Sequence, residues 1–355
     1  MFLIRAIKKL FSQSLFLIKF FLRCFLYTTI FLLTTVAHAE WLSDEQSIMG
    51  TSVSVTLWHD DPVIGEQAIA AVMAEMRRID ETFSPYKPAS ELSVVNREAF
   101  KKPLTMSSEL TAIIDKALFY SRVSQGAFDI TFASVGKHYD YRNKQQPTDQ
   151  QREELIEAIN YQFIQVDKKT NAIKFLHPNV QIDLGGIAKG YAVDRGAQIL
   201  TDYQVTNATI SAGGDSRIVG DKRGEPWVIG IKKPRGLQAS DAVKRDQVAI
   251  MLPLENTAIS TSGDYERFFI NEKTGERVHH ILNPKTGKSA SGIVSVSVIG
   301  PVGFDTDPLS TTVFVLGVEK GLKLINKFKG FDCVIIDSAG NVHYSEGLEP
   351  PVNPA

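Results

Sequence analysis

Hydrophobic and polar residues alternate in short runs along much of this chain, and longer stretches with helical spacing lie between them. Strands are predicted by alternation or by short apolar runs at 52–58, 227–231, 258–269, 293–299 and 333–336. Helices are predicted by spacing at 68–80, 110–124, 152–159, 306–317 and 321–328. Because most strands follow one another as hairpins, the pattern favours an α+β fold over a doubly wound sheet. We expect one large domain with mostly antiparallel strands and packed helices.

The stretch 180–200 combines several features of a ligand-binding corner. Alternation at 180–184 predicts a half-buried strand, two glycines at 185–186 interrupt it, and residues 187–200 predict a helix. Glycines let the backbone approach a ligand, and the start of a helix offers unpaired N–H groups to an anion. Lys189 adds a positive charge in the first turn. The glycine spacing matches neither the dinucleotide fingerprint nor the P-loop, so a phosphate site and simple packing both remain open.

The first 39 residues differ in composition from the rest of the chain. They carry five Lys and Arg residues and no acidic residue, a largely apolar run at 24–36, and Ala-His-Ala at 37–39. This pattern is typical of a secretory signal peptide with its cleavage site. We therefore predict a signal peptide at 1–39, a mature domain at 40–355 and a periplasmic location. The alternative is an uncleaved segment that anchors the protein in the inner membrane.

The charge balance and the cysteine content limit the possible partners and disulfides of the protein. Residues 40–355 retain 34 of the 39 Lys and Arg residues, against 40 Asp and Glu, and this acidic balance argues against a nucleic-acid partner. Cys333 is the single cysteine of that region, so no internal disulfide is possible there. It lies in an apolar, strand-like run, which indicates a buried, inert thiol.

Nine short motifs follow one another along the predicted mature domain. They are MGT (49–51), FSPY (83–86) with SEL (90–92), GAFD (126–129), DLGGIAKGYAVD (183–194), GGD (213–215), WVIGI (227–231), TSGDYERF (261–268), HHILNPKTG (279–287) and TDPLSTTVFVLG (306–317). In this order they resemble the ApbE family of exported FAD:protein FMN transferases, from about residue 49 to residue 336. Three positions depart from the family pattern: Asn283, Ile130 and Pro308. None is assigned to chemistry, although the first two lie beside the implied flavin site.

The resemblance implies a divalent metal, Mg²⁺ with Mn²⁺ as an alternative, between the protein and the pyrophosphate of FAD. The implied ligands are the side chains of Asp307 and Thr311 and a backbone carbonyl at Gly186. Residues four apart share one face of a helix, and oxygen ligands completed by phosphate suit Mg²⁺. The simpler interpretation of Asp307 is a helix N-cap, with Pro308 at the first helical position.

The resemblance also implies a set of flavin-binding positions. They are Met49, Tyr86, Ala127, Phe128, Asp129, Asp183, Lys189 and Ile281. Tyr86 and Phe128 offer ring faces to an isoalloxazine or adenine ring, although buried aromatic residues often belong simply to the core. Asp183 is suited to accept from ribose, adenine or a ring N–H. Its alternative role is to accept from the backbone of the glycine corner.

His280 is the candidate general base. If this segment is extended, the neighbouring His279 points to the opposite face, so the two histidines should not bind one metal. The implied reaction is attack by a threonine hydroxyl of an acceptor protein on the FMN-side phosphorus of FAD, with release of AMP. The metal and Lys189 would offset charge on the phosphates, and His280 would take the hydroxyl proton.

Two other functions remain possible at this stage. A metal-dependent FAD pyrophosphatase would use water in place of the threonine and give FMN and AMP. A non-catalytic FAD-binding protein would have no need of a metal at the pyrophosphate, so the presence of both Asp307 and Thr311 speaks against it. For a transferase, the resemblance suggests subunits of membrane redox complexes or exported flavoproteins as acceptors.

Overall fold

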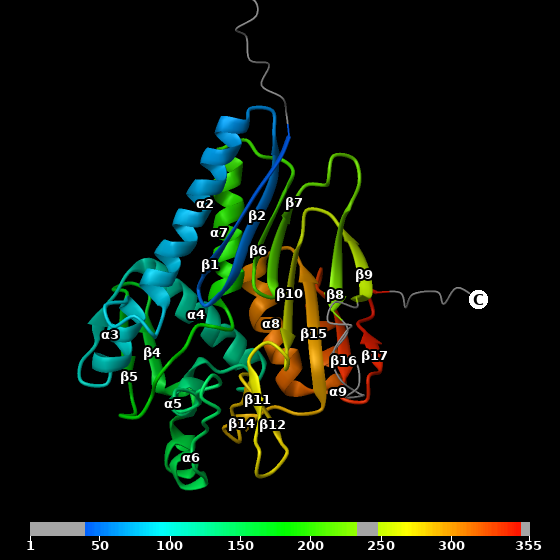
Figure 1. The fold of residues 1–355 in the computed structure, drawn as a ribbon. Helices are drawn as coiled ribbons and strands as arrows, with labels where there is room; N and C mark the ends of the chain where they lie inside the picture. Colours follow the sequence, from blue (N-terminus) through cyan, green and yellow to red (C-terminus); the bar gives the residue numbers. More distant parts are fainter. Residues whose placement is uncertain (1–39, 233–247, 349–355) are drawn as a thin grey trace, which may run out of the picture.

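The computed structural model describes residues 40–232 and 248–348 (Figure 1). The predicted signal peptide at 1–39 lies outside the described residues. Within the described part, no helix is long and apolar enough to cross a membrane.

The fold is built on an eight-stranded sheet in which every neighbouring pair of strands is antiparallel. In order across the sheet the strands are β1 (Glu40–Ile48), β2 (Thr51–His59), β6 (Ala208–Ala212), β7 (Asp215–Val219), β10 (Ala258–Gly263), β15 (Ile293–Gly300), β16 (Asp332–Asp337) and β17 (Val342–Tyr344). Alternate residues such as Val53, Val55 and Ile210 are fully buried on the side that the helices cover. The prediction of an α+β fold with mostly antiparallel strands is confirmed.

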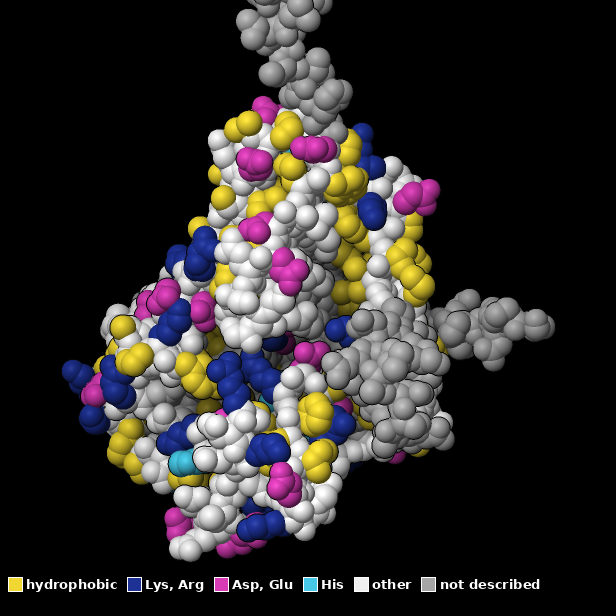
Figure 2. Space-filling view, in the orientation of Figure 1, with side chains coloured by type: hydrophobic (Ala, Val, Ile, Leu, Met, Phe, Trp, Pro, Cys, Tyr) yellow, Lys and Arg dark blue, Asp and Glu magenta, His cyan; other side chains and the backbone are white. Residues whose placement is uncertain are grey.

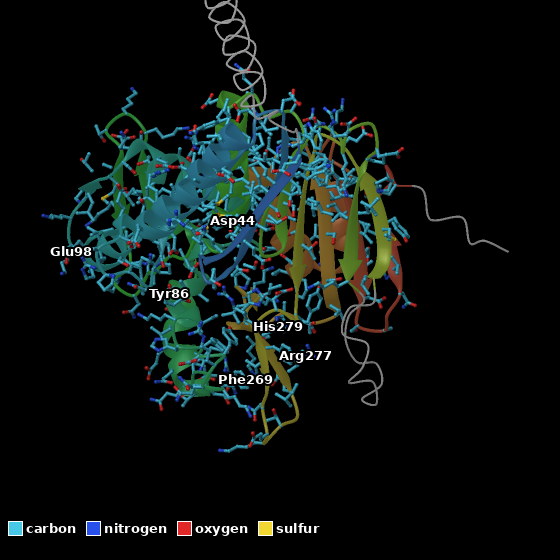
Figure 3. All side chains as sticks on the ribbon, turned by 45° about the horizontal axis from the view of Figure 1, so that its top comes forward. Asp44, Tyr86, Glu98, Phe269, Arg277 and His279 are labelled. Carbon is cyan, nitrogen blue, oxygen red and sulfur yellow. The ribbon has the colours of Figure 1, made fainter. Side chains whose placement is uncertain are left out.

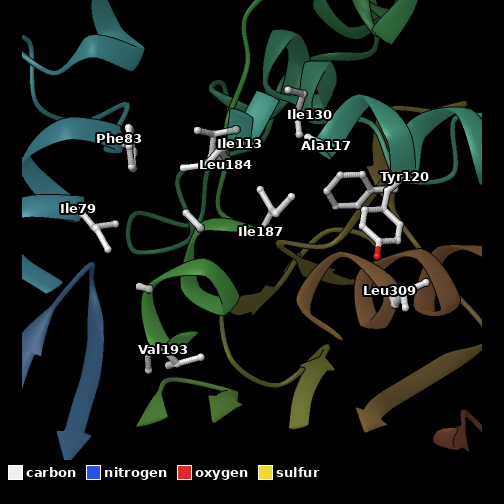
Figure 4. Packing of buried hydrophobic residues seen from close by; sticks show 14 of the residues in the cluster. Ile79, Phe83, Ile113, Ala117, Tyr120, Ile130, Leu184, Ile187, Val193 and Leu309 are labelled. Atoms are coloured by element: carbon white, nitrogen blue, oxygen red, sulfur yellow. The ribbon is translucent and has the colours of Figure 1, made fainter. Parts of the chain in front are cut away.

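Four helices pack on one face of this sheet (Figure 1). They are α2 (Pro62–Phe83), α7 (Ala188–Asp202), α8 (Gly303–Leu316) and α9 (Val318–Ile325). Figure 4 shows Ile79 of α2, Val193 of α7, Leu309 of α8 and Ile113 of α4 (Ser108–Val123), which belong to one buried core. Apolar side chains at helical spacing therefore join these helices into one core with the sheet.

The remaining described elements form a smaller helical layer and four small sheets. The layer contains α3 (Glu91–Glu98), α5 (Ala133–Gly136), α6 (Asp149–Leu155) and 3₁₀ turns at Ile130–Phe132, Ile156–Ala158 and Tyr161–Phe163. The small sheets pair β3 (Leu104–Thr105), β5 (Ala172–Phe175) and β4 (Ile164–Asp167); β8 (Trp227–Lys232) and β9 (Val248–Leu254); β11 (Phe268–Ile270) and β12 (Arg277–His279); and β13 (Leu282–Asn283) and β14 (Lys288–Ser289). The β11–β12 hairpin carries part of the predicted site.

The predicted helices and most predicted strands are present, with boundaries moved by a few residues. The strand predicted at 180–184 is wrong. Val180, Ile182 and Leu184 are buried as expected, but the backbone of this extended segment has no neighbouring strand. The Asn96 side chain instead donates to the Ile182 carbonyl at 2.9 Å and accepts from the Ile182 N–H at 2.8 Å. The side-chain amide of Asn96 therefore makes the backbone hydrogen bonds that a neighbouring strand would otherwise make.

Cys333 is buried in β16, in agreement with the sequence interpretation. Burial, reinforced by the charge of Asp332, raises the pKa of its thiol to about 12. The thiol is therefore protonated at neutral pH and inert as a nucleophile.

Candidate functional site

The site is organised by the crossing of α7 and α8, where each helix caps the other. Asp307 of α8 accepts the N–H of Gly190 in the first turn of α7, at 3.0 Å. Asp194 of α7 accepts the N–H groups of Gly303 and Phe304 at the start of α8, at 2.9 and 2.8 Å. The alternative considered from the sequence, that Asp307 caps its own helix, is wrong, because α8 begins four residues earlier, at Gly303. Its carboxylate instead accepts a hydrogen bond from a backbone N–H in the first turn of α7, which has no partner within that helix.

The two helices touch at Gly190 and Gly303. A Cβ atom added to Gly190 would lie 2.0 Å from the carbonyl oxygen of Gly303, which is backbone and cannot rotate away. A Cβ on Gly196, further along α7, would meet the ends of the Ile210 and Val72 side chains at 3.0 Å, and these can move. The glycine of the AKGYAVD motif therefore sets the separation of the two helices.

We predict that Gly190→Ala lowers the free energy of unfolding by about 2–3 kcal/mol, because the new methyl group overpacks the crossing. Gly196→Ala is the matched control. It gains helix propensity of about 1 kcal/mol and meets only side-chain methyl groups, at 3.0 Å or more, so its stability should stay within about 1 kcal/mol of the parent. Urea unfolding measures both variants. Equal stabilities for the two would show that the crossing is looser than the structure indicates.

Two buried carboxylates face a single ammonium group at this crossing. Lys189 Nζ lies 2.6 Å from Asp215 Oδ2 and 3.4 Å from Asp307 Oδ2. Asp215 and Asp307 are each only 2% exposed. Burial, together with the charge of Asp215, raises the pKa of Asp307 to about 7, although Lys189 acts in the opposite direction. With both carboxylates ionised the cluster carries one uncompensated negative charge, which favours a bound cation.

Thr311 and Gly186 lie next to this cluster. Thr311 follows Asp307 by one turn of α8, and its Oγ1 is 3.2 Å from Ser262 Oγ. A Cβ on Gly186 would lie 3.4 Å from Thr311 Oγ1 and 3.3 Å from the Phe128 ring, so the lack of a side chain lets both residues lie close to the Gly186 backbone. The structure thus brings Gly186 to Thr311, one turn from Asp307.

The donor set fits Mg²⁺ that is completed by substrate. In the described residues, no group of three or more His, Cys, Asp and Glu side chains is placed to hold a metal. A carboxylate, a hydroxyl and a backbone carbonyl are hard oxygen ligands, and Mg²⁺ is commonly held by one or two carboxylates with phosphate and water filling the other positions. An oxygen set of this kind suits a metal that arrives with the pyrophosphate.

His279 and His280 have different environments, as the sequence predicts. His279 is buried, and its ring nitrogens meet the Ala290 carbonyl at 2.8 Å and the Ile281 N–H at 3.3 Å. His280 is half-buried, and its Nδ1 has no hydrogen-bond partner among the described residues. Burial, followed by the charge of Arg267, lowers the pKa of His280 to about 3, so the ring is neutral at physiological pH. His280 is therefore neutral and keeps one ring nitrogen without a partner among the described residues, and the lowered pKa makes it a weaker base than an ordinary histidine.

The predicted flavin positions divide into exposed and buried groups. Tyr86 is 81% exposed, and Figure 3 shows it to the left of the hairpin that carries Phe269 and His279. Phe128 is buried against Tyr120, and Ala127 and Ile281 are buried as well. Met49 forms the β1–β2 turn in a left-handed conformation. Only Tyr86 therefore offers a freely accessible ring.

Both aspartates of this set already have partners in the backbone. Asp129 accepts from the N–H and hydroxyl of Thr131 and from the N–H of Tyr161, at 2.6–2.9 Å. Asp183 accepts from the Gly185 N–H at 2.6 Å, the alternative role considered from the sequence. The second carboxylate oxygen of Asp183 keeps capacity to accept from a ligand.

Three residues near the site were not assigned by sequence reasoning: Asp215, Ser262 and Arg267. The first two stand in the GGD and TSGDYERF motifs, where their polar character beside glycines was an available signal. Arg267 had no such signal, because its position depends on the pairing of distant segments. Figure 2 shows Lys and Arg side chains gathered around a hollow above the β11–β12 hairpin.

Comparisons with known proteins show the family of this chain. The profile described as "ApbE family" matches residues 49–335. An FAD:protein FMN transferase of Treponema pallidum is 28% identical over 88% of this chain and 89% of its own length. One of Haemophilus influenzae is 31% identical over 79% and 82%. The ApbE protein of Thermotoga maritima superposes with a TM-score of 0.76, at 33% identity over 87% of this chain and 98% of its own. The flavin transferase ApbE of Vibrio cholerae also gives 0.76, at 25% identity and the same coverage. The chain therefore belongs to the ApbE family.

Proposed function

We propose that this chain is an FAD:protein FMN transferase that uses Mg²⁺ and attaches FMN to a threonine of an exported or membrane-bound flavoprotein. Its curated relatives carry the name FAD:protein FMN transferase. The observation that carries the proposal is the Asp215–Lys189–Asp307 cluster, which sets two buried carboxylates against one ammonium group beside Thr311 and Gly186. Such a place attracts a metal that can hold a pyrophosphate.

The residues of the site would then have the following roles. Asp307, Thr311 and the Gly186 carbonyl would hold Mg²⁺, or Mn²⁺, which supplies Lewis-acid stabilisation of phosphate charge. Tyr86 and Asp183 would position the flavin nucleotide. His280, neutral and with a free ring nitrogen, would accept the proton of the threonine hydroxyl. The threonine Oγ forms a bond to the FMN-side phosphorus, the bond from that phosphorus to the bridging oxygen breaks, and AMP leaves.

Hydrolysis of FAD is the competing reaction at the same site. Water in place of threonine would give free FMN and AMP. We expect AMP release to depend on an acceptor protein. The test is to incubate the enzyme with FAD and Mg²⁺, with and without a candidate acceptor, and to quantify AMP and free FMN by chromatography. AMP that appears only with the acceptor, without an equal amount of free FMN, supports transfer; equal AMP and FMN in both samples would make the protein a pyrophosphatase.

Export is a second part of the proposal, supported by the composition of residues 1–39. We predict that the mature protein begins at Glu40 and is found in the periplasm. N-terminal sequencing of the protein from a periplasmic fraction checks this. A protein that keeps residues 1–39 and is found in the inner-membrane fraction would show that this segment is an uncleaved anchor.

A further inference from the structure

Lys189 is a poor candidate for the cation that holds the phosphates, because its charge is already engaged. It pairs with Asp215 at 2.6 Å and Asp307 at 3.4 Å. A pyrophosphate that approached Lys189 would meet an ammonium group with two negative neighbours. A side chain that contacts the phosphates directly with an unpaired positive charge, beside the proposed metal, must therefore come from another part of the chain.

Arg267 meets this requirement. Its Nη2 donates to the carbonyl oxygen of Gly50, in the β1–β2 turn, at 3.2 Å. Within residues 40–232 and 248–348, no carboxylate forms a salt bridge with it, whereas Arg277 of the same hairpin pairs with Asp264 at 3.5 Å. The Gly50 carbonyl is neutral, so the charge of Arg267 has no counterion there. A guanidinium held in this way keeps its remaining N–H donors for an anion.

The β11–β12 hairpin places Arg267 beside His280. Phe268 pairs with His279 in the ladder, so Arg267 stands opposite His280, and the N–H of His280 donates to the Arg267 carbonyl at 3.1 Å. Residues directly opposite in an antiparallel pair present their side chains on the same face, with Cβ atoms about 4.5–5.5 Å apart. The guanidinium and the candidate base therefore share one face of the hairpin, and Phe268 and His279 share the other.

The influence of Arg267 on its neighbours agrees with this placement. After burial, its charge is the largest contribution to the lowered pKa of His280. Burial raises the pKa of Asp183, and the N–H of Gly185 and the charge of Arg267 act against that rise. The charge of Arg267 therefore acts on both the candidate base and a predicted flavin-binding carboxylate.

We propose that Arg267 binds a phosphate oxygen of FAD and so holds the pyrophosphate over His280. This inference rests on the proposed function, since it takes FAD as the substrate. Arginine suits the role because its planar fork can give two parallel bonds to a phosphate. Binding by Arg267 would leave Lys189 to its structural task of holding the two carboxylates together.

The test compares FAD with riboflavin, which lacks phosphate. Binding is measured by flavin fluorescence with Mg²⁺ present, for the parent, Arg267→Gln, Arg267→Lys and the control Arg277→Gln. Arg277 lies on the other face of the hairpin, over the Phe268 ring. We expect Arg267→Gln to weaken FAD binding about 10- to 100-fold, the effect of one hydrogen bond to a charged group, and to leave riboflavin binding unchanged. The FAD affinity of Arg267→Lys should lie between those of the parent and Arg267→Gln. Arg277→Gln should bind FAD as tightly as the parent.

The outcomes separate this inference from the proposed function. If the parent binds FAD no better than riboflavin, the pyrophosphate is not the handle and the proposed function itself is in question. If the parent prefers FAD and Arg267→Gln keeps that preference, only the role of Arg267 is overturned. Equal losses for FAD and riboflavin would mean that Arg267 supports the β1–β2 turn and does not contact phosphate.

Discussion

Replacing Asp307 by asparagine should abolish FMN transfer while leaving the protein folded. The asparagine carbonyl can still accept the Gly190 N–H, so the capped crossing of α7 and α8 is retained. The negative charge, however, is lost, and with it the only carboxylate among the proposed metal ligands. A metal that stabilises phosphate charge contributes several kcal/mol to the transition state, so we expect the transfer rate to fall by about 1000-fold or more. Transfer assays at several Mg²⁺ concentrations measure this effect.

Two comparisons make the Asp307 result specific. Asp307→Ala removes both the ligand and the cap, so it should lose stability as well as activity, by about 1–3 kcal/mol for the Gly190 N–H that it leaves buried and unsatisfied. Asp307→Asn should melt close to the parent temperature, since Lys189 still pairs with Asp215. Full Mg²⁺-dependent activity in Asp307→Asn would mean that Asp307 serves the helix crossing alone.

Replacing His280 by alanine should slow FMN transfer by about 10²–10⁴-fold, the usual contribution of a positioned general base. The ring is neutral, and its Nδ1 has no partner in the described residues, so this nitrogen keeps a lone pair for the hydroxyl proton. FAD and Mg²⁺ should still bind, because the imidazole is assigned to neither. Single-turnover transfer and flavin binding, measured on the same preparation, separate the two effects.

His343→Gln is the matched control for His280. His343 lies on the edge strand β17, where its ring meets Asp337 at 2.9 Å, away from α7 and α8. It should transfer FMN at the parent rate. If His280→Ala also transfers at the parent rate, another group takes the proton, and the neutral ring has a structural role.

The sequence predicted the elements because their patterns are local. The helices at 68–80 and 110–124 and the strand at 52–58 each carry an apolar face that repeats within a few residues. The segment 180–184 shows the limit of this reasoning. Alternation correctly identified its buried side, but burial does not require a strand partner, and the Asn96 side chain supplies the hydrogen bonds instead.

The site was less accessible to sequence reasoning because it depends on contacts between distant segments. Asp307 looked like a cap of its own helix, and the structure makes it a cap of α7. Lys189 looked like a free phosphate-binding charge, and Asp215, from another motif, engages it. Arg267 reaches the site through hairpin pairing and its bond to Gly50. None of these relations is visible in residue spacing.

Intact-mass analysis of an acceptor protein tests the central proposal most directly. The parent enzyme, FAD, Mg²⁺ and a candidate acceptor should give an acceptor heavier by one FMN less one water, with AMP released in equal amount. The mass shift should vanish when the acceptor threonine is replaced by valine, when Mg²⁺ is chelated, or when Asp307→Asn replaces the parent. An unmodified acceptor alongside consumed FAD, or a shift that persists without Mg²⁺, would contradict the account.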